Sequence, residues 1–411
     1  MVEMCAALQP LWESGSTEDA HRHAEVLTEH INTHGVRTLM SERILEALLD
    51  KLKSKKHAED RERAAIGLGA IASKVAGKNA PLPLGAEPWL IPAIAPLLET
   101  YADKNEKAKQ AAESAMASIV PLFPPEAAAE LLDVLYGVIM SSTAKWQAKV
   151  GALKIIGRLA DLAYEQVGDE LTQMTPVLTQ AMHETKAEVS KQAIKTATKV
   201  CGVIDNNDIR PFIPDLVGCM ARPDSVPACI KKLSSITFVA EVTGPALAVM
   251  VPLLSRALNE RSQTVQRQSV IIVDNLCKLV RDPHTAALYL PGLLPSVERI
   301  EEGASFPEVR EHAKSAVHTL RTAFAAADAS KQDPQGTDPL ARLAEARAKA
   351  LQRLADAVQP RVPTGVVFSA LGDAFTRTGL EYVSRVVVRL ADKRIVQAEP
   401  WNDVYVLPYL R

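Results

Sequence analysis

The chain has 411 residues, of which 47% are hydrophobic and only 4% aromatic, and its 47 Lys and Arg nearly balance its 49 Asp and Glu. The formal net charge of −2 excludes a globally basic nucleic-acid-binding protein, although it does not exclude a local basic surface. At roughly 150 residues per domain the length predicts two to three domains. The scarcity of aromatic residues favours closely packed helices over a β-sandwich or a barrel.

The cysteines are widely spaced and form no CxxC pair, which predicts reduced thiols in a cytoplasmic protein. They are Cys5, Cys201, Cys219, Cys229 and Cys277. Pro, Lys or Asp interrupts every long apolar run well before the roughly 18 residues that a membrane span needs, so no transmembrane segment is predicted. The first twelve residues contain no basic residue and do not resemble a secretory signal.

A repeat of nearly 40 residues organises most of the chain. Its copies have a Pro, then a Leu two residues later, then a small and an apolar residue. They begin at Pro176, Pro214, Pro252 and Pro291, at spacings of 38, 38 and 39 residues. Upstream, Pro96 begins another copy, and the 80 residues before Pro176 leave room for one more unit, in which Asp133 takes the Pro position.

Most copies are followed by a second amphipathic stretch, in which two small or β-branched residues lie four apart and so share one helix face. These pairs are Ala148 and Ala152, Val189 and Ala193, Val265 and Ser269, and Val309 and Ala313. A period near 40 with two helices per unit is typical of HEAT and armadillo repeats, so we predict an all-α, HEAT/armadillo-like α-solenoid. Its prolines should lie in first turns or bend the first helix of each pair.

Seven helix pairs are predicted, because no pair can bury its apolar face without stacking on a neighbour. They should start near Val36, Ala86, Pro125, Tyr164, Asp208, Thr243 and Pro283. The predicted domains are an N-terminal cap at 1–35, the solenoid at 36–325, a polar linker at 326–339 and a partial helical bundle at 340–411. The apolar segment at the end of the chain has no polar cap, which favours a fragment of a longer protein.

No catalytic or metal site is evident. The GxxxxGK[ST] motif that cradles nucleotide phosphates is absent, since Gly77-Lys78 is followed by Asn79. His23, His30 and His34 fall on one helix face, but the HExxH glutamate is missing and no Cys or carboxylate cluster accompanies them in the sequence. We therefore interpret this face as plain surface, and we predict no metal and no cofactor.

Basic residues are the candidate binding groups. Lys191, Lys195 and Lys199 form a stripe at four-residue spacing, opposite the apolar face of their helix. Basic inter-helix turns on one edge of a solenoid could follow a phosphate backbone. The alternative for each group is an ordinary solvated outer face. The candidate set is Lys191, Lys195, Lys199, Arg256, Arg261 and Arg267.

From about Glu87 onward the sequence resembles the N-terminal part of fungal-type translation elongation factor 3. The most specific stretch lies between Asn207 and Pro283. It contains Asp208-Ile-Arg-Pro-Phe-Ile-Pro214, Thr237-Phe-Val-Ala-Glu-Val242, Met250-Val-Pro-Leu-Leu-Ser-Arg-Ala-Leu-Asn-Glu-Arg261 and Ser269-Val-Ile-Ile-Val-Asp-Asn-Leu-Cys-Lys-Leu-Val280. Lys145-Trp-Gln-Ala-Lys149 is a second resemblance, and the segment from Tyr382 to Leu410 resembles part of the helical bundle of that family.

The resemblance implies a cytosolic, non-membrane factor that binds rRNA and ribosomal proteins during elongation, not DNA, with other translation factors as further candidate partners. In the family, two ATP-binding cassettes downstream of the HEAT domain drive release of spent tRNA from the exit site. This chain has no Walker A, Walker B or cassette signature. ATP and Mg²⁺ are thus implied only for a full-length member, and the chain itself should be non-catalytic.

An alternative from another functional class remains open. The chain could be a general HEAT scaffold for protein partners, such as a ribosome-associated activator of the amino-acid-starvation kinase, whose HEAT units resemble those of elongation factor 3. A tubulin-binding array and a transport adaptor belong to the same class. A partner that binds independently of nucleic acid would favour this alternative.

Overall fold

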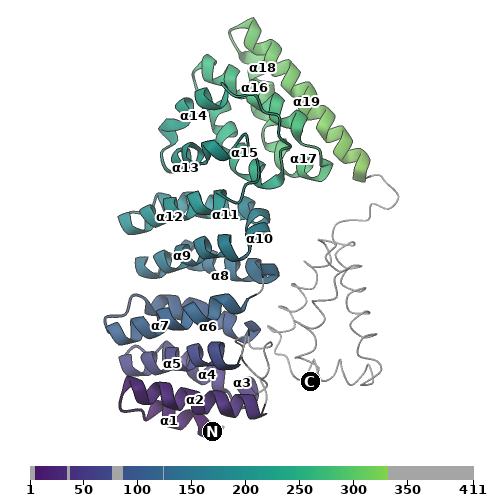
Figure 1. The fold of residues 1–411 in the computed structure, drawn as a ribbon. Coiled ribbons are helices and arrows are strands. Elements are labelled where there is room, and N and C mark those ends of the chain that lie inside the picture. The colour runs from purple at the N-terminus through teal and green to yellow at the C-terminus, as the bar shows by residue number, and fades with distance from the viewer. Residues whose placement is uncertain (1–4, 35–37, 76–86, 124, 332–411) are drawn as a thin grey trace, which may run out of the picture. The chain divides into compact units, whose positions relative to one another are not determined.

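The structure is a computed structural model that describes residues 5–34, 38–75, 87–123 and 125–331. These residues form helices and turns and contain no β-strand (Figure 1). The predicted bundle at 340–411 lies outside the described residues, as does the predicted linker beyond Lys331. The described chain falls into two compact units, one up to Ile155 and one from Ile156 onward.

The all-α repeat fold predicted from the sequence is confirmed, and seven helix pairs are present in the described residues. In the first unit the pairs are α4 (Ile44–Leu52) with α5 (Ala58–Ala70), and α6 (Glu87–Thr100) with α7 (Glu106–Ile119). The third pair, α8 (Ala128–Met140) and α9 (Trp146–Leu162), ends in the second unit. The others are α11 (Leu171–Met182) with α12 (Ala187–Cys201), α13 (Ile213–Ala221) with α14 (Val226–Leu233), α15 (Gly244–Leu258) with α16 (Gln263–Leu279), and α18 (Leu294–Gly303) with α19 (Pro307–Lys331).

Other elements precede or join these pairs. At the N-terminal end the turn η1 (Ala6–Leu8), α1 (Gln9–Trp12), α2 (Thr17–His34) and α3 (Thr38–Ser41) come before the first pair. Helices α10 (Tyr164–Asp169) and α17 (Pro283–Tyr289) lead into later pairs. The remaining elements are single turns: the π-turn η2 (Ile71–Val75) and the 3-10 turns η3 (Val120–Leu122), η4 (Pro125–Ala127), η5 (Arg210–Phe212), η6 (Pro223–Ser225) and η7 (Leu290–Gly292).

The repeat prolines lie where the pattern predicts. Pro214 occupies the first turn of α13, where its missing N–H has no helical partner to lose. Pro176 and Pro252 lie inside α11 and α15, where each removes one backbone hydrogen bond. The repeated positions of the second helices face the core, since the four small or β-branched pairs are at most 7% exposed. Helix α19 continues to Lys331, so the first six residues of the predicted linker are helical.

Candidate nucleic-acid interface

Helix α12 presents the predicted lysine stripe to solvent. Its buried face contains Val189 and Ala193 at one-turn spacing, followed by Ala197 and Val200, all at most 1% exposed. Because this face packs inward, the opposite face carries Lys191, Lys195 and Lys199, which are all exposed. The structure thus places these three lysines together on one helix surface.

Among the described residues, two of these three lysines have no ion-pair partner. Lys199 forms an ion pair with Asp161 at the end of α9, so part of its charge is neutralised within the second unit. Lys191 and Lys195 make no ion pair with any carboxylate in the described part of the chain. These two ammonium groups are therefore the ones on α12 that a phosphate could neutralise without breaking an internal contact.

The three arginines lie on another pair. Arg256 is in the last turn of α15, Arg261 is in the turn that follows, and both are exposed. Arg267, on α16, donates through Nε to Oε1 of Glu308 on α19 at 3.0 Å. Arg267 therefore ties two neighbouring pairs together, and it offers less free charge than Arg256 or Arg261.

The turns inside successive pairs contribute basic residues that the sequence analysis did not select. Lys186 ends the turn between α11 and α12, and Arg222 follows α13 directly; both are exposed. Nε2 of His183 lies 3.1 Å from the carbonyl oxygen of Met220, which joins the first of these turns to the end of α13. We call Lys186, Arg222 and Arg261 the turn edge. The signal available in the sequence was one Lys or Arg between the two helices of each of these three pairs.

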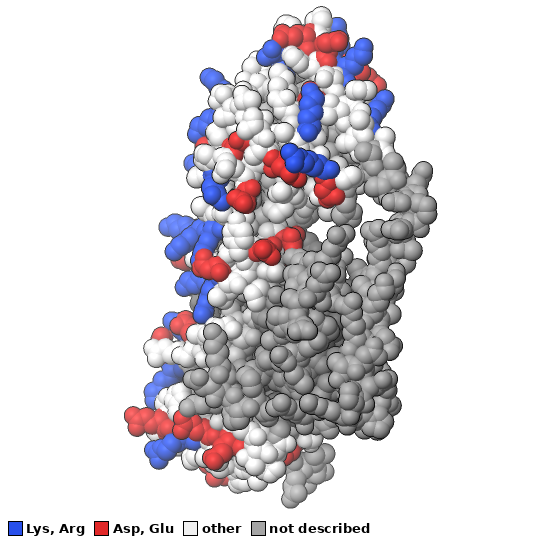
Figure 2. All heavy atoms as spheres, turned by 45° about the vertical axis from the view of Figure 1, so that its right-hand side comes forward, with Lys and Arg blue, Asp and Glu red and all other residues white. Residues whose placement is uncertain are grey.

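Acidic residues accompany the turn edge. Glu188 lies in the first turn of α12, Asp224 lies two residues after Arg222, and Glu260 precedes Arg261. Figure 2 likewise shows blue and red side chains interleaved on the described surface. Because exposed charges are screened within about 8–10 Å at physiological salt, this surface can attract phosphates only through individual close contacts.

Hydrogen bonds with residues before α13 fix the backbone of the segment between α14 and α15, which lies in the stretch that most resembles elongation factor 3. The Asp208 carboxylate accepts hydrogen bonds from the backbone N–H groups of Val239 and Ala240, at 2.7 and 2.8 Å. The Asn206 side chain donates to the carbonyl oxygen of Glu241 at 3.0 Å. These hydrogen bonds hold the segment in a conformation in which Val239 is 72% exposed. Sequence reasoning missed Val239, because only the tertiary contact decides which side chain of this segment faces solvent.

A groove of about 360 Å³ lies between α2, α5 and α7, lined largely by Ala, Ser and Thr. Its ionisable side chains, His21, Glu25 and Lys107, are all exposed. The groove therefore lacks the desolvated ionisable group that is typical of an active site.

In the described residues, no helix is both long enough and apolar enough to cross a membrane.

The comparisons with known proteins agree with this repeat architecture. A sequence model described as the EF3 N-terminal HEAT repeat matches residues 20–197, and one described as the Elongation factor 3/GNC1 HEAT repeat matches residues 225–331. The fold and these matches define a HEAT-repeat protein. Over these residues the chain is an N-terminal HEAT region of the elongation factor 3 type.

Two curated relatives and one solved structure illustrate the similarity. The chain is 42% identical over 301 residues to the mRNA export factor elf1 of Schizosaccharomyces pombe, covering 73% of this chain and 28% of that protein. It is 34% identical over 359 residues to Elongation factor 3 of Zygosaccharomyces rouxii, covering 86% of this chain and 32% of that protein. The karyopherin Kap121p is 13% identical, with a TM-score of 0.38 over 98% of this chain and 38% of that one. The chain thus spans about a third or less of these curated relatives.

Proposed function

We propose that this chain is the ribosome-binding HEAT module of an elongation-factor-3-like protein that acts in translation elongation in the cytoplasm. The observation that carries the proposal is the match of two elongation factor 3 HEAT models across both compact units. Both models describe HEAT repeats, and we assign the module no reaction of its own. Release of exit-site tRNA would belong to the longer protein.

Binding would use exposed basic groups that are not already paired. Phosphates of rRNA would contact Lys191 and Lys195 on α12, Arg256 at the end of α15, and the turn edge. Ribosomal proteins would contact neighbouring polar and apolar groups such as Val239. Each neutralised phosphate releases counterions, so the affinity should fall as the salt concentration rises. The mixed charge of the surface favours site-specific contacts over attraction by a long-range field.

The relative named mRNA export factor elf1 supports a second candidate function. In that case the same basic groups would bind messenger ribonucleoprotein rather than ribosomes. A general protein scaffold, such as a regulator of the starvation-response kinase, is the third candidate. The three candidate functions differ in which particle the chain co-sediments with and in whether nuclease treatment abolishes that co-sedimentation.

Co-sedimentation of the purified chain with ribosomes across a salt series tests the proposal. We expect retention at low salt and progressive loss as salt rises. The test variant combines Lys191→Glu, Lys195→Glu, Arg256→Glu and Arg261→Glu. This variant should bind more weakly, and its salt slope should be smaller by about 0.7–0.9 for each phosphate that it no longer neutralises.

The matched control makes the same change in net charge at other exposed lysines. It combines Lys56→Glu, Lys104→Glu, Lys107→Glu and Lys314→Glu. Equal weakening by both variants would mean that net charge rather than this surface governs binding. Absence of retention at every salt concentration would contradict ribosome binding by this chain, and retention on polyadenylated RNA alone would favour the second candidate.

A further inference from the structure

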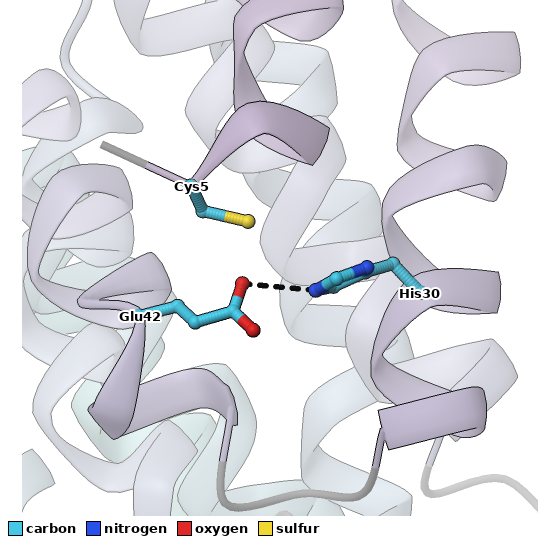
Figure 3. A group of neighbouring side chains, drawn as sticks. All are labelled: Cys5, His30 and Glu42. Atoms are coloured by element: carbon cyan, nitrogen blue, oxygen red, sulfur yellow. Dashed lines mark hydrogen bonds and ion pairs between the residues drawn. The ribbon is translucent and has the colours of Figure 1, made fainter. Parts of the chain in front are cut away.

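Three potential metal ligands meet near the N-terminal end of the described chain. Cys5 precedes η1, His30 lies in the last part of α2, and Glu42 follows α3 (Figure 3). One ligand atom from each of these side chains lies within 4.8 Å of the other two. Nε2 of His30 is 2.9 Å from Oε2 of Glu42.

This cluster could not be recognised from the histidine face in the sequence. The sequence offered no Cys or carboxylate beside His23, His30 and His34, but the fold brings Cys5 and Glu42 to His30. His23 is directed elsewhere, since its Nδ1 lies 2.9 Å from the Ser14 hydroxyl. Of the three histidines, only His30 belongs to the cluster.

We propose that Cys5, His30 and Glu42 form a Zn²⁺ site that joins the start of the described chain to α2 and to the turn before α4. Thiolate, imidazole and carboxylate are the ligand types that zinc takes in proteins, at about 2.0–2.3 Å. A tetrahedral ion at those bond lengths separates its ligand atoms by roughly 3.3–3.8 Å. The ligand atoms lie within 4.8 Å of one another, so the more distant ones would move together on binding, whereas Nε2 of His30 and Oε2 of Glu42, now 2.9 Å apart, would move slightly apart. A water molecule would take the fourth position.

The charges and packing of the cluster fit a divalent cation. One thiolate and one carboxylate supply two negative charges, and a neutral imidazole completes the set, so the occupied site would be electrically balanced. The Cys5 side chain is buried, whereas His30 and Glu42 are partly exposed, with 25% and 33% of their side-chain surfaces accessible. An ion could therefore enter from solvent and bind against a fixed sulfur.

The geometry disfavours cysteine catalysis at the same place. Burial, followed by the hydrogen bond to Glu42, raises the pKa of the Cys5 thiol. The thiol thus keeps its proton and directs it to the carboxylate, whereas a catalytic cysteine needs a thiolate beside a base. When Zn²⁺ binds, the S–H proton passes to the buffer and a Zn–S bond forms, with no oxidation or reduction.

The metal should be zinc rather than magnesium or calcium, because those two ions take oxygen ligands almost exclusively.

The backbone beside the cluster is also unusual. Arg43, which follows Glu42, has φ 55° and ψ 28°, and it is the only non-glycine residue with positive φ in the described part of the chain. This conformation turns the chain sharply between Glu42 and α4.

Cobalt substitution of the untagged, metal-stripped chain tests the site, because Co²⁺ bound to a thiolate gives a charge-transfer band in the near ultraviolet. We expect one equivalent of Co²⁺ to bind with release of about one proton and to produce the band, one equivalent of Zn²⁺ to displace Co²⁺ and abolish the band without further proton release, and Mg²⁺ to have no effect. Zn²⁺ should also raise the thermal unfolding midpoint of the chain.

Substitutions identify the ligands. Cys5→Ser should remove the band while far-ultraviolet circular dichroism stays unchanged, and His30→Gln and Glu42→Gln should each weaken binding by more than about tenfold. The matched control, His21→Gln, changes an exposed histidine of the same helix and should bind normally. Absence of the band in the unmodified chain, or its persistence in the Cys5→Ser variant, would overturn the proposal. Neither result bears on ribosome binding.

Discussion

At the scale of single residues, one ion pair between neighbouring helix pairs differs from the others. Arg61 on α5 contacts Asp103, in the turn between α6 and α7, through two hydrogen bonds of 2.5 and 3.0 Å. The Arg61 and Asp103 side chains are only 18% and 6% exposed. Most of the other ion pairs join more exposed side chains; Asp161, the partner of Lys199, is 63% exposed. Removal of the carboxylate should therefore lower the free energy of unfolding much more at Asp103 than at Asp161.

Asp103→Asn should lower the free energy of unfolding by about 2–4 kcal/mol at pH 7, because it leaves the partly buried guanidinium unpaired. Burial alone would raise the pKa of Asp103, but hydrogen bonds from Arg61 and the Asn105 N–H, together with the Arg61 charge, lower it overall. A carboxyl group with a lowered pKa stabilises the folded state above its unfolded pKa, and this contribution disappears as pH falls through the folded pKa.

Urea unfolding at several pH values measures this contribution. The gap between the unmodified chain and the variant should be widest near neutral pH and should shrink below about pH 4. As the control, Asp161→Asn should cost less than about 1 kcal/mol. A gap that stays constant from pH 7 down to pH 3, or equal costs for the two variants, would contradict the role assigned to the Arg61–Asp103 pair.

At the scale of elements, close approach between second helices depends on small residues. A methyl group added at Gly69 on α5 would lie 3.1 Å from Cα and 3.3 Å from Cβ of Ala115 on α7. Backbone atoms cannot rotate away as a flexible side chain can, so the two helices would have to separate. Gly137 on α8 is different, because nothing lies within 4 Å of the corresponding position.

Gly69→Ala and Gly137→Ala should consequently have opposite effects. The first should destabilise the fold by about 1–3 kcal/mol, since overpacking outweighs the gain in helix propensity. The second should stabilise it by roughly 0.5–1 kcal/mol, since Ala loses less backbone entropy than Gly in a helix. Thermal unfolding of both variants checks this pair of outcomes, and stabilisation by Gly69→Ala would show that α5 and α7 are less tightly packed than the structure indicates.

The elements could largely be predicted from the sequence, whereas the contacts between them could not. Each helix pair is encoded by local periodicity and local capping; for example, the Asn105 side chain accepts hydrogen bonds from two N–H groups at the start of α7. The partner of Lys199 lies 38 residues away and that of Arg267 lies 41 residues away, so no local pattern reveals which basic groups are free. The cluster of Cys5, His30 and Glu42 was missed for the same reason.

At the scale of the whole molecule, many interactions in the described chain connect pairs that are neighbours in sequence, although Thr172 on α11 also forms a hydrogen bond with Tyr289 at the end of α17, 117 residues away. Arg61 with Asp103, His183 with Met220, and Arg267 with Glu308 each span only 37 to 42 residues. When contacts are this local, stability is close to a sum over pairs and their nearest-neighbour interfaces. A truncation between pairs should then be tolerated far better than one within a pair.

A fragment of residues 125–331 should therefore fold on its own, because it begins before α8 and keeps the third and every later pair intact. We expect a helical circular dichroism spectrum and a cooperative urea transition. The fragment 187–331 differs by starting inside a pair. It lacks α11, whose Leu171, Met174 and Leu178 are at most 2% exposed, so the core face of α12 would be open to water and the midpoint should be lower. Equal midpoints, or an unfolded longer fragment, would mean that stability is shared over the full chain. A folded 125–331 fragment also carries Lys186, Arg222 and Arg261, so its retention on ribosomes would assign the binding surface to this part of the molecule.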